Sequence, residues 1–169
     1  MTHSTERRSL PVRRPFLFLD VDGPLIPFGV AAGSVDPLER LDPGVGARLL
    51  GLGCRMVWAT TWMGEADEIV GPRVGLPPLP VLGGSGGDGE GSPGPRGLHW
   101  KVPLIVEWAG SEPFVWVDDE IGAVDRDWVA AAHPGPFLLH RVDPARGLTD
   151  ADFAALHAWL RGVAWPPAG

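Results

Sequence analysis

Two acids follow the first apolar run of the chain at a spacing of two residues. The segment Phe16–Leu19 leads directly into Asp20, Val21, Asp22 and Gly23. Side chains at positions i and i+2 of an extended segment point to the same side, so Asp20 and Asp22 are expected to share one site. Two carboxylates this close repel each other unless a cation or a proton lies between them. The pair therefore predicts a metal site, a nucleophile with its proton donor, or both, although Asp and Gly also form ordinary turns.

Other polar groups follow the later predicted elements: Thr60 and Thr61 after an apolar segment at 55–59, Lys101 at the start of a helix, and Asp118 with Asp119 after an apolar segment at 114–117. If the apolar segments are parallel strands, their carboxyl ends lie at one edge of a sheet, where α/β proteins place their chemistry. Hydroxyl, ammonium and carboxylate groups gathered at that edge indicate a pocket.

The spacing of apolar residues predicts strands that alternate with helices. Strands are expected at 16–19, 55–59, 114–117 and 136–142, with a short edge strand at 79–82 because its proline is excluded from the centre of a sheet. The first helix is expected to have Asp42 as its N-cap and Pro43 at its first position, and to end near Gly51 or Gly53. Further helices are expected at 62–70 with a break at Gly71-Pro72, at 101–109, at 125–132, and from Thr149, which forms a capping box with Asp152. This order predicts an α/β fold, a Rossmann-like three-layer sandwich with a mainly parallel sheet, in a single domain over residues 16–165.

Composition narrows the class of protein. A chain of 169 residues fits one domain, and a net charge of -7 argues against an extended duplex-binding surface. Cys54 is the only cysteine, which excludes an intramolecular disulfide and predicts a small hydrophobic role for this side chain. No apolar run approaches the roughly 18 residues that span a membrane. A soluble, cytoplasmic protein without a membrane partner is expected.

Two segments are expected to be flexible. Residues 1–15 carry several arginines but no apolar core, so they predict a disordered basic leader rather than a secretory signal. Residues 83–97 consist almost entirely of Gly, Ser, Pro and charged residues, which predicts a mobile loop.

The ordered set Asp20-Val21-Asp22-Gly23, Thr60, Lys101 and Asp118-Asp119 resembles the four motifs of the haloacid dehalogenase (HAD) superfamily of phosphohydrolases. The resemblance runs from about residue 16 to residue 160. Further stretches are similar to the HAD domain of bacterial proteins associated with RNA repair, the "Swiss Army Knife" group: residues 59–62, 75–77, 99–101, 115–120 and 147–149, and Trp159-Leu160. The family's pattern often has Thr after the glycine, where this chain has Pro24.

The resemblance implies a role for each motif residue. Asp20 is expected to attack phosphorus and form an aspartyl-phosphate, and Asp22 to protonate the leaving oxygen and then deprotonate water. Lys101 is expected to stabilise the transferring group. Thr60 is preferred as the hydrogen-bond donor to a phosphoryl oxygen. Its neighbour Thr61 competes for this role, because a shift of one residue at the strand end would exchange the two.

The resemblance also implies a Mg²⁺ site, because this cation prefers oxygen ligands. The expected ligands are the carboxylates of Asp20 and Asp118, the backbone carbonyl of Asp22, and the side chain of Asp119. Gly23 is expected to lie at the substrate, together with Thr61.

The expected substrate is a phosphorylated small molecule or the phosphate at a nucleic-acid end. Only about twenty residues separate Asp22 from Asp42, which leaves room for a flap at 25–29 but not for a cap domain. A phosphotransferase of the same fold and a non-catalytic Mg²⁺-binding module of a nucleic-acid repair system remain open. A dehalogenase has no need of a second acid, and the presence of Asp22 argues against it.

Aromatic and charged residues outside the motifs are expected to be structural for the most part. Trp58, Trp116, Trp128 and Trp159 are expected in the core. Trp62 and Trp100 flank the predicted pocket, where packing is favoured over stacking on a base. His99 is placed near the substrate, Asp125 at a solvated helix start, and His133, His140 and His157 at the surface or at strand ends.

Overall fold

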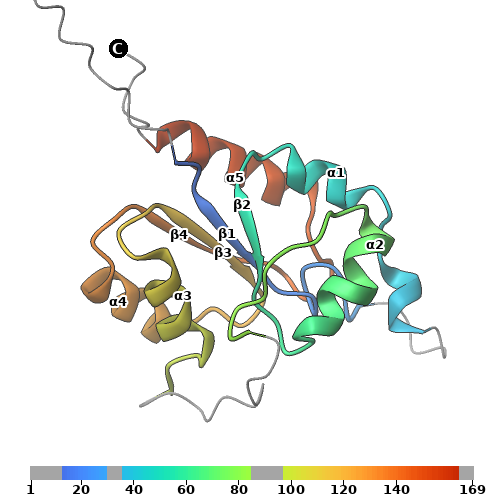
Figure 1. The fold of residues 1–169 in the computed structure, drawn as a ribbon, viewed down its shortest axis with the longest axis horizontal. Helices are drawn as coiled ribbons and strands as arrows, with labels where there is room; N and C mark the ends of the chain where they lie inside the picture. The colour runs from blue at the N-terminus through green and yellow to red at the C-terminus, as the bar shows by residue number, and fades with distance from the viewer. Residues whose placement is uncertain (1–12, 30–35, 85–96, 164–169) are drawn as a thin grey trace, which may run out of the picture.

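The computed structural model describes residues 13–29, 36–84 and 97–163. Its sheet has four parallel strands: β1 (Phe16–Leu19), β2 (Arg55–Trp58), β3 (Phe114–Asp118) and β4 (Phe137–Arg141), in the order β2-β1-β3-β4 (Figure 1). Because every pairing is parallel, the carboxyl ends of the strands share one edge. The mainly parallel sheet predicted from the sequence is therefore confirmed.

Helices cover both faces of the sheet (Figure 1). On one face lie α3 (Lys101–Ala109) and α4 (Ala123–Ala132); on the other lie α1 (Val45–Leu50), α2 (Gly71–Val74) and α5 (Asp150–Gly162). Two short segments complete the described helical structure: the 3-10 turn η1 (Pro37–Arg40) and the wider π-type turn η2 (Ala66–Val70). The protein thus has the α/β layering of a Rossmann-like fold.

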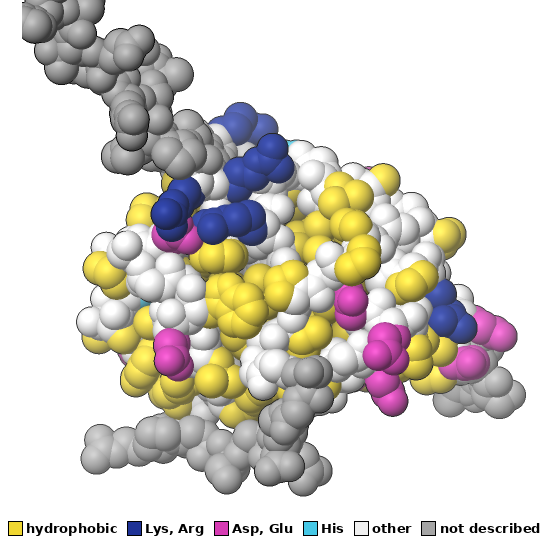
Figure 2. Space-filling model, in the orientation of Figure 1, with side chains coloured by type: hydrophobic (Ala, Val, Ile, Leu, Met, Phe, Trp, Pro, Cys, Tyr) yellow, Lys and Arg dark blue, Asp and Glu magenta, His cyan; other side chains and the backbone are white. Residues whose placement is uncertain are grey.

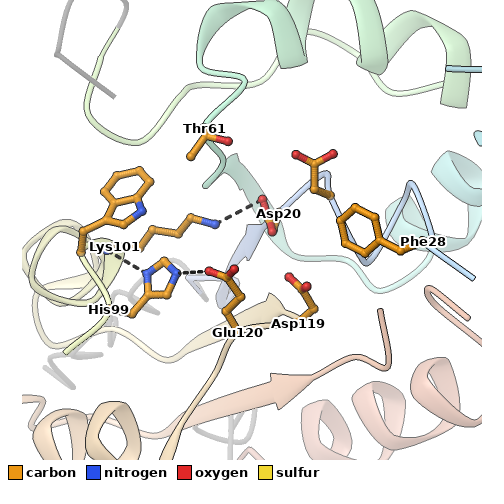
Figure 3. A pocket seen from close by; sticks show the side chains of 9 residues that line it. Asp20, Phe28, Thr61, His99, Lys101, Asp119 and Glu120 are labelled. Carbon is orange, nitrogen blue, oxygen red and sulfur yellow. Dashed lines mark hydrogen bonds and ion pairs between the residues drawn. The ribbon is translucent and has the colours of Figure 1, made fainter. Parts of the chain in front are cut away.

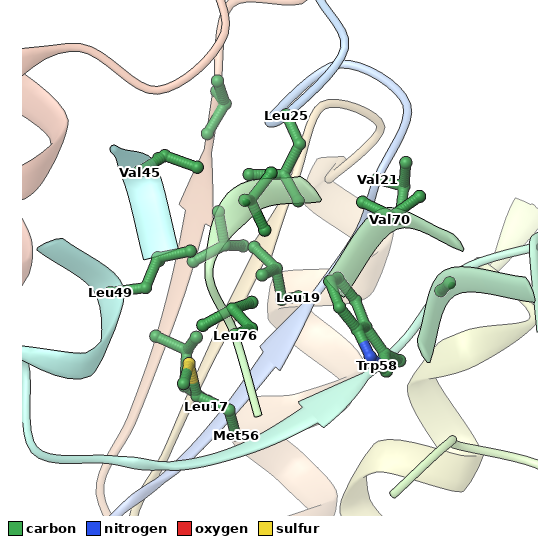
Figure 4. Packing of buried hydrophobic residues seen from close by; sticks show 14 of the residues in the cluster. Leu17, Leu19, Val21, Leu25, Val45, Leu49, Met56, Trp58, Val70 and Leu76 are labelled. Carbon is green, nitrogen blue, oxygen red and sulfur yellow. The ribbon is translucent and has the colours of Figure 1, made fainter. Parts of the chain in front are cut away.

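The alternation of β1 divides the apolar core between the two faces. Leu17 and Leu19 pack with α1, α2 and α5, and Phe18 packs with α3 and α4. Figure 4 shows the first of these clusters, in which Leu49 and Leu76 pack beside the two leucines of β1. Each fully buried leucine contributes roughly 1.5–3 kcal/mol, so the strands are held from both sides.

The buried tryptophans support the sheet on either side of β1. Trp58 of β2 and Trp116 of β3 are fully buried, as predicted. Trp128 and Trp159 are only partly buried and pack against the two clusters.

The helical segment after β2 does not break at Gly71-Pro72, so that prediction is wrong. The backbone N–H of Gly71 donates to the carbonyl of Ala66, five residues earlier, and the wider turn carries the chain into α2. Pro72 then lies at the start of a new helical turn, where its missing N–H is tolerated. The helix ends at Gly75, whose φ of 83° favours glycine.

Two further predicted boundaries differ. Residues 79–82 form a single parallel bridge, between Val81 and Trp58, rather than a strand. The first helix begins at Val45 instead of Pro43, because the carboxylate of Asp42 accepts a hydrogen bond from Gly44 N at 2.8 Å and forms a separate turn. The capping box that opens α5 is confirmed, with Thr149 and Asp152 bonded to each other's backbone N–H.

Two predicted surface residues are buried instead. Asp125 is only 3% exposed and belongs to the first turn of α4, which begins at Ala123. His133 is 6% exposed and lies edge-on to the rings of Phe114 and Phe137. The end of α4 packs onto the sheet there, and burial lowers the pKa of His133.

Basic side chains gather toward one end of the face shown in Figure 2. Arg13 precedes β1 and Arg55 opens β2, and both pair with Glu112, at 2.9 and 2.6 Å. These ion pairs lie at the amino ends of the strands, at the sheet edge opposite Asp20 and Asp118.

The predicted leader at 1–15 and the predicted mobile loop at 83–97 fall largely outside the described residues. Among the helices described here, none combines the length and apolar character needed to cross a membrane.

Candidate active site

The candidate site lies where the chain direction across the sheet reverses. From β1 the chain passes to β2 on one side and later returns to β3 on the other, so β1 and β3 are the neighbours at the switch point. Ligands of open parallel sheets bind at such a point, outside the carboxyl ends of the strands. The backbone N–H of Asp20 extends this pairing by donating to the carbonyl of Val117 at 3.1 Å.

Asp20 and Asp22 leave β1 together, as predicted. Asp20 is 7% exposed and Asp22 is partly buried, and both line a hollow of about 220 Å³. A tight turn follows, in which Ile26 N donates to the carbonyl of Val21 and Gly23 N donates to the carbonyl of Ile26, both at 3.0 Å. The turn fixes the backbone on which the two acids are mounted.

Lys101 opens α3 and extends its ammonium group to the end of β1. Its Nζ lies 3.2 Å from Oδ1 of Asp20 and 2.6 Å from Oδ2 of Asp118 (Figure 3 draws the Asp20 contact). The residue is only 3% exposed. Burial alone would lower the pKa of Lys101, but the charges of the two carboxylates outweigh it and raise the pKa. A positive charge is therefore held between Asp20 and Asp118.

The end of β3 supplies two more carboxylates at different depths. Asp118 is fully buried, and its second oxygen accepts from Glu120 N at 3.0 Å. Asp119 is partly exposed and lines the hollow. Burial, followed by the neighbouring Asp118, raises the pKa of Asp119 to about 6. Burial and the neighbouring carboxylate thus disfavour the ionised form of Asp119.

Burial also disfavours the ionised form of Asp20. Burial raises its pKa to about 7, with Lys101 opposing this shift and the charge of Asp118 adding to it. One carboxylate oxygen from each of Asp20, Asp118 and Asp119 lies within 4.8 Å of the others. A hard divalent cation fits such an all-oxygen set and relieves its repulsion. A second set, His99, Asp118 and Glu120, is equally compact, but its imidazole Nε2 is already bonded to Glu120 at 3.1 Å.

The two threonines after β2 have different surroundings. Thr61 is exposed and lines the hollow, and Figure 3 shows it across from Asp20. Thr60 is 1% exposed, and its Oγ1 accepts a hydrogen bond from Trp62 N at 3.2 Å. Thr61 rather than Thr60 therefore lines the hollow, whereas the sequence favoured Thr60 for contact with a ligand.

A flap at residues 25–29 borders the hollow, and Phe28 on it is 56% exposed. The backbone N–H of Phe28 donates to Pro144 at 2.7 Å, and Leu148 N donates to Pro24 at 2.9 Å. The loop between β4 and α5 thus holds the flap at both ends. In the sequence, only a lone aromatic residue in a Gly- and Pro-rich stretch marked this position.

The opposite wall is formed by His99, Trp100 and Glu120. Asp125 accepts from His99 N at 2.8 Å and from Gly122 N at 2.8 Å, so the predicted solvated acid is a buried clamp on this wall. One of its partners, His99, lies 26 residues earlier in the sequence, which explains why this role was missed. Glu120 was marked only by its position after the two aspartates, in the stretch 115–120 that is similar to the RNA-repair group.

Most predicted site residues meet at this hollow. Asp20, Asp22, Thr61, Lys101 and Asp119 line it, Asp118 lies beneath it, Gly23 contacts Asp119, and Thr60 lies behind the wall. No protein-family model, curated protein or solved structure among those compared with the chain matches it. Function is therefore inferred from the groups at the hollow and from their resemblance to the HAD motifs.

Proposed function

We propose that the protein is a Mg²⁺-dependent phosphomonoester hydrolase of the capless HAD type, acting through an aspartyl-phosphate on Asp20. The observation that carries this proposal is the placement of Lys101 Nζ, 3.2 Å from Asp20 and 2.6 Å from the buried Asp118. A carboxylate that is partly neutralised, yet still faces a hollow, has the environment of a nucleophile toward an anionic phosphate. A simple structural ion pair would have no need of Asp22 and Thr61 on the same walls.

Two displacements at phosphorus complete the reaction. In the first, a carboxylate oxygen of Asp20 attacks phosphorus, the bond to the leaving oxygen breaks, and Asp22 donates its proton to that oxygen. In the second, Asp22 takes a proton from water, the water oxygen attacks phosphorus, the bond between phosphorus and the Asp20 oxygen breaks, and inorganic phosphate leaves. Both Asp20 and Asp22 are thereby restored.

Lys101 and Thr61 act on the charge that moves in these steps. The Lys101 ammonium group lies beside the attacking carboxylate and offsets charge on the transferring phosphoryl group. The hydroxyl of Thr61 lines the hollow and donates to a phosphoryl oxygen. A fixed donor and a buried cation are more effective here than in water because they need not reorganise.

A divalent cation fits the carboxylate oxygens of Asp20, Asp118 and Asp119, which lie within 4.8 Å of one another, together with the backbone carbonyl of Asp22. When bound, Mg²⁺ would neutralise negative charge shared between the nucleophile and the phosphate. The raised pKa values of Asp20, about 7, and of Asp119, about 6, support a cationic partner for this set.

The shape of the hollow favours the end of a phosphorylated molecule. Its volume of about 220 Å³ accommodates a phosphate and part of its leaving group. In the described part of the chain, the segment between Asp22 and β2 contributes only the flap to the border of the hollow, and no cap domain follows β2. Such a site can accept a small phosphomonoester or a terminal phosphate of a nucleic acid.

Phosphate release with and without Mg²⁺ tests the proposal. The panel comprises p-nitrophenyl phosphate, mononucleotides, and RNA and DNA oligonucleotides with 3′- or 5′-phosphates. The wild type is expected to release phosphate from at least one of them, and Asp20→Asn to release none while keeping its melting temperature.

The matched control is Asp127→Asn, an exposed acid of α4 outside the hollow, which is expected to retain activity. No release by the wild type from any substrate, with Mg²⁺ shown to bind, would contradict the hydrolase. Equal release by Asp20→Asn would reject Asp20 as the nucleophile.

A further inference from the structure

A tryptophan from the end of β2 makes a direct contact with the proposed proton donor. The indole Nε1 of Trp62 donates a hydrogen bond to Oδ2 of Asp22 at 3.0 Å. The two residues are 40 positions apart in sequence, and the bond is partly buried. The motif resemblance assigns no role to an indole at this position, so the contact is a feature of this site beyond the motif residues.

The backbone around Trp62 is arranged to present the indole in this position. Trp62 N donates to Thr60 Oγ1 at 3.2 Å, and Met63 N donates to the carbonyl of Thr60 at 3.3 Å. Met63 has a φ of 51°, and among the described residues it is the only non-glycine residue with positive φ. Such strain costs about 1–3 kcal/mol and persists only where the surrounding structure enforces it.

The indole ring is also held by packing. Trp62 packs against the apolar cluster that includes Leu19 and Val21. Its turn continues into the next helical segment through Glu65 N, which donates to the carbonyl of Trp62 at 3.1 Å. The turn and the packing together therefore fix the direction of the indole N–H in the absence of a ligand.

This geometry distinguishes the two oxygens of Asp22. An indole N–H only donates, so Oδ2 is held as an acceptor. The proton that Asp22 passes to a leaving group then resides on Oδ1, which is the oxygen free to turn toward the hollow. Proton transfer in catalysis requires hydrogen-bond reach and a fixed direction.

We propose that Trp62 is a positioning residue that holds the carboxyl group of Asp22 with Oδ1 toward the leaving oxygen. Thr60 acts one step further out, by holding the turn that carries Trp62. This inference rests on the proposed function, since it assigns a device for the proton transfer of that reaction. A purely structural Trp62 would stabilise the fold without favouring substrates that need the proton.

Leaving-group dependence separates these two roles. Departure of p-nitrophenolate needs no proton, whereas departure of an alkoxide from an alkyl phosphomonoester does. The ratio kcat/KM reports steps up to the first irreversible one, here formation of the aspartyl-phosphate. Trp62→Phe is expected to lower kcat/KM for an alkyl phosphomonoester by about 10- to 100-fold, which is part of the roughly 10²–10⁴-fold that complete acid–base catalysis contributes. The same variant is expected to lower kcat/KM for p-nitrophenyl phosphate by less than about threefold.

The chain offers a matched control in Trp58, whose Nε1 donates to Asp67 Oδ1 at 3.2 Å outside the hollow. Trp58→Phe removes the same kind of bond and is expected to leave the ratio between the two substrates unchanged. In an Asp22→Asn background, Trp62→Phe is expected to have little further effect on the alkyl ester, because coupled residues are not additive. Trp62→His, which restores a ring N–H, is expected to recover part of the loss and guards against a fold-disrupting effect of Phe.

The outcomes separate the inference from the function on which it rests. Equal losses on both esters, or full activity of Trp62→Phe on the alkyl ester, would overturn the positioning role while leaving the hydrolase intact. Absence of turnover by the wild type on these two esters and on the rest of the panel, with Mg²⁺ shown to bind, would overturn the hydrolase and the positioning role together. A selective loss on the alkyl ester supports both.

Discussion

A β-carbon placed on Gly23 would lie 2.6 Å from Cγ of Asp119. The turn after β1 and the turn after β3 therefore fit together only because residue 23 has no side chain. Gly23 also has a φ of 96°, which other residues rarely adopt. Glycine is thus required for two reasons at this position, and the first of them, the close approach to Asp119, ties it to a proposed metal ligand.

Replacement of Gly23 by alanine is expected to displace the carboxylate of Asp119. We expect Gly23→Ala to weaken Mg²⁺ binding, measured by calorimetry, and to lower phosphate release by about tenfold or more, in the range found for disturbed metal surroundings. Gly64→Ala is the control, since its β-carbon meets nothing within 4 Å and its φ is not positive. Similar binding by the two variants would refute the proposed contact.

Because the two threonines have different surroundings, their replacement is expected to affect different properties, activity for Thr61 and stability for Thr60. Thr61→Val removes a hydroxyl from the hollow and is expected to lower kcat/KM by about 10- to 100-fold, with an unchanged melting temperature. Thr60→Val removes the acceptor of Trp62 N and is expected to cost about 1–3 kcal/mol of unfolding free energy. Urea unfolding and phosphate release on both variants check this pair. A loss of activity on p-nitrophenyl phosphate confined to Thr60→Val, without loss of stability, would reverse the assignment.

Mg²⁺ binding is expected to strengthen as pH rises from about 5 to 8. The pKa of Asp20 is raised to about 7 and that of Asp119 to about 6, so both carboxyl groups hold protons at the lower pH. A cation must displace these protons, and binding then levels off above the higher pKa. Thermal shifts with added MgCl₂ across this range measure the effect. Asp119→Asn is expected to show weaker binding with a shallower pH dependence, and a slope equal to that of the wild type would exclude Asp119 as a ligand.

The capping box of α5 predicts a pH-dependent contribution to stability. Burial alone would raise the pKa of Asp152, but hydrogen bonds from Thr149 and His140 outweigh it and lower the pKa. A lowered folded-state pKa contributes stability above the unfolded value, which is lost as pH falls through the folded value. Asp152→Ala is therefore expected to cost about 1 kcal/mol near pH 7 and less near pH 3. Asp150→Ala, whose side chain is 95% exposed, is the control in urea unfolding, and a cost for Asp152→Ala that does not change with pH would contradict the prediction.

The strands and their polar ends could be predicted because their signals are local. Phe16–Leu19 and Phe114–Asp118 are apolar runs that must be buried on both faces, and parallel pairing then places Asp20 and Asp118 at one edge. The helix at Lys101–Ala109 and the capping box at Thr149 likewise follow from neighbouring residues. Gly71-Pro72 misled the prediction because the π-type turn leads directly into a new α-helical turn, whose first positions tolerate proline.

By itself, the sequence determined the α/β order of the elements and the set of residues that follow the strands, since both depend on apolar periodicity over a few residues. Three features were decided only by the tertiary structure: the exposure of Thr61 to the hollow, the burial of Asp125, and the hydrogen bond from the Trp62 indole to Asp22. These features depend on the direction of a side chain after a strand ends and on contacts between segments far apart in sequence. Periodicity fixes the face on which a residue lies, whereas packing fixes the atom it touches.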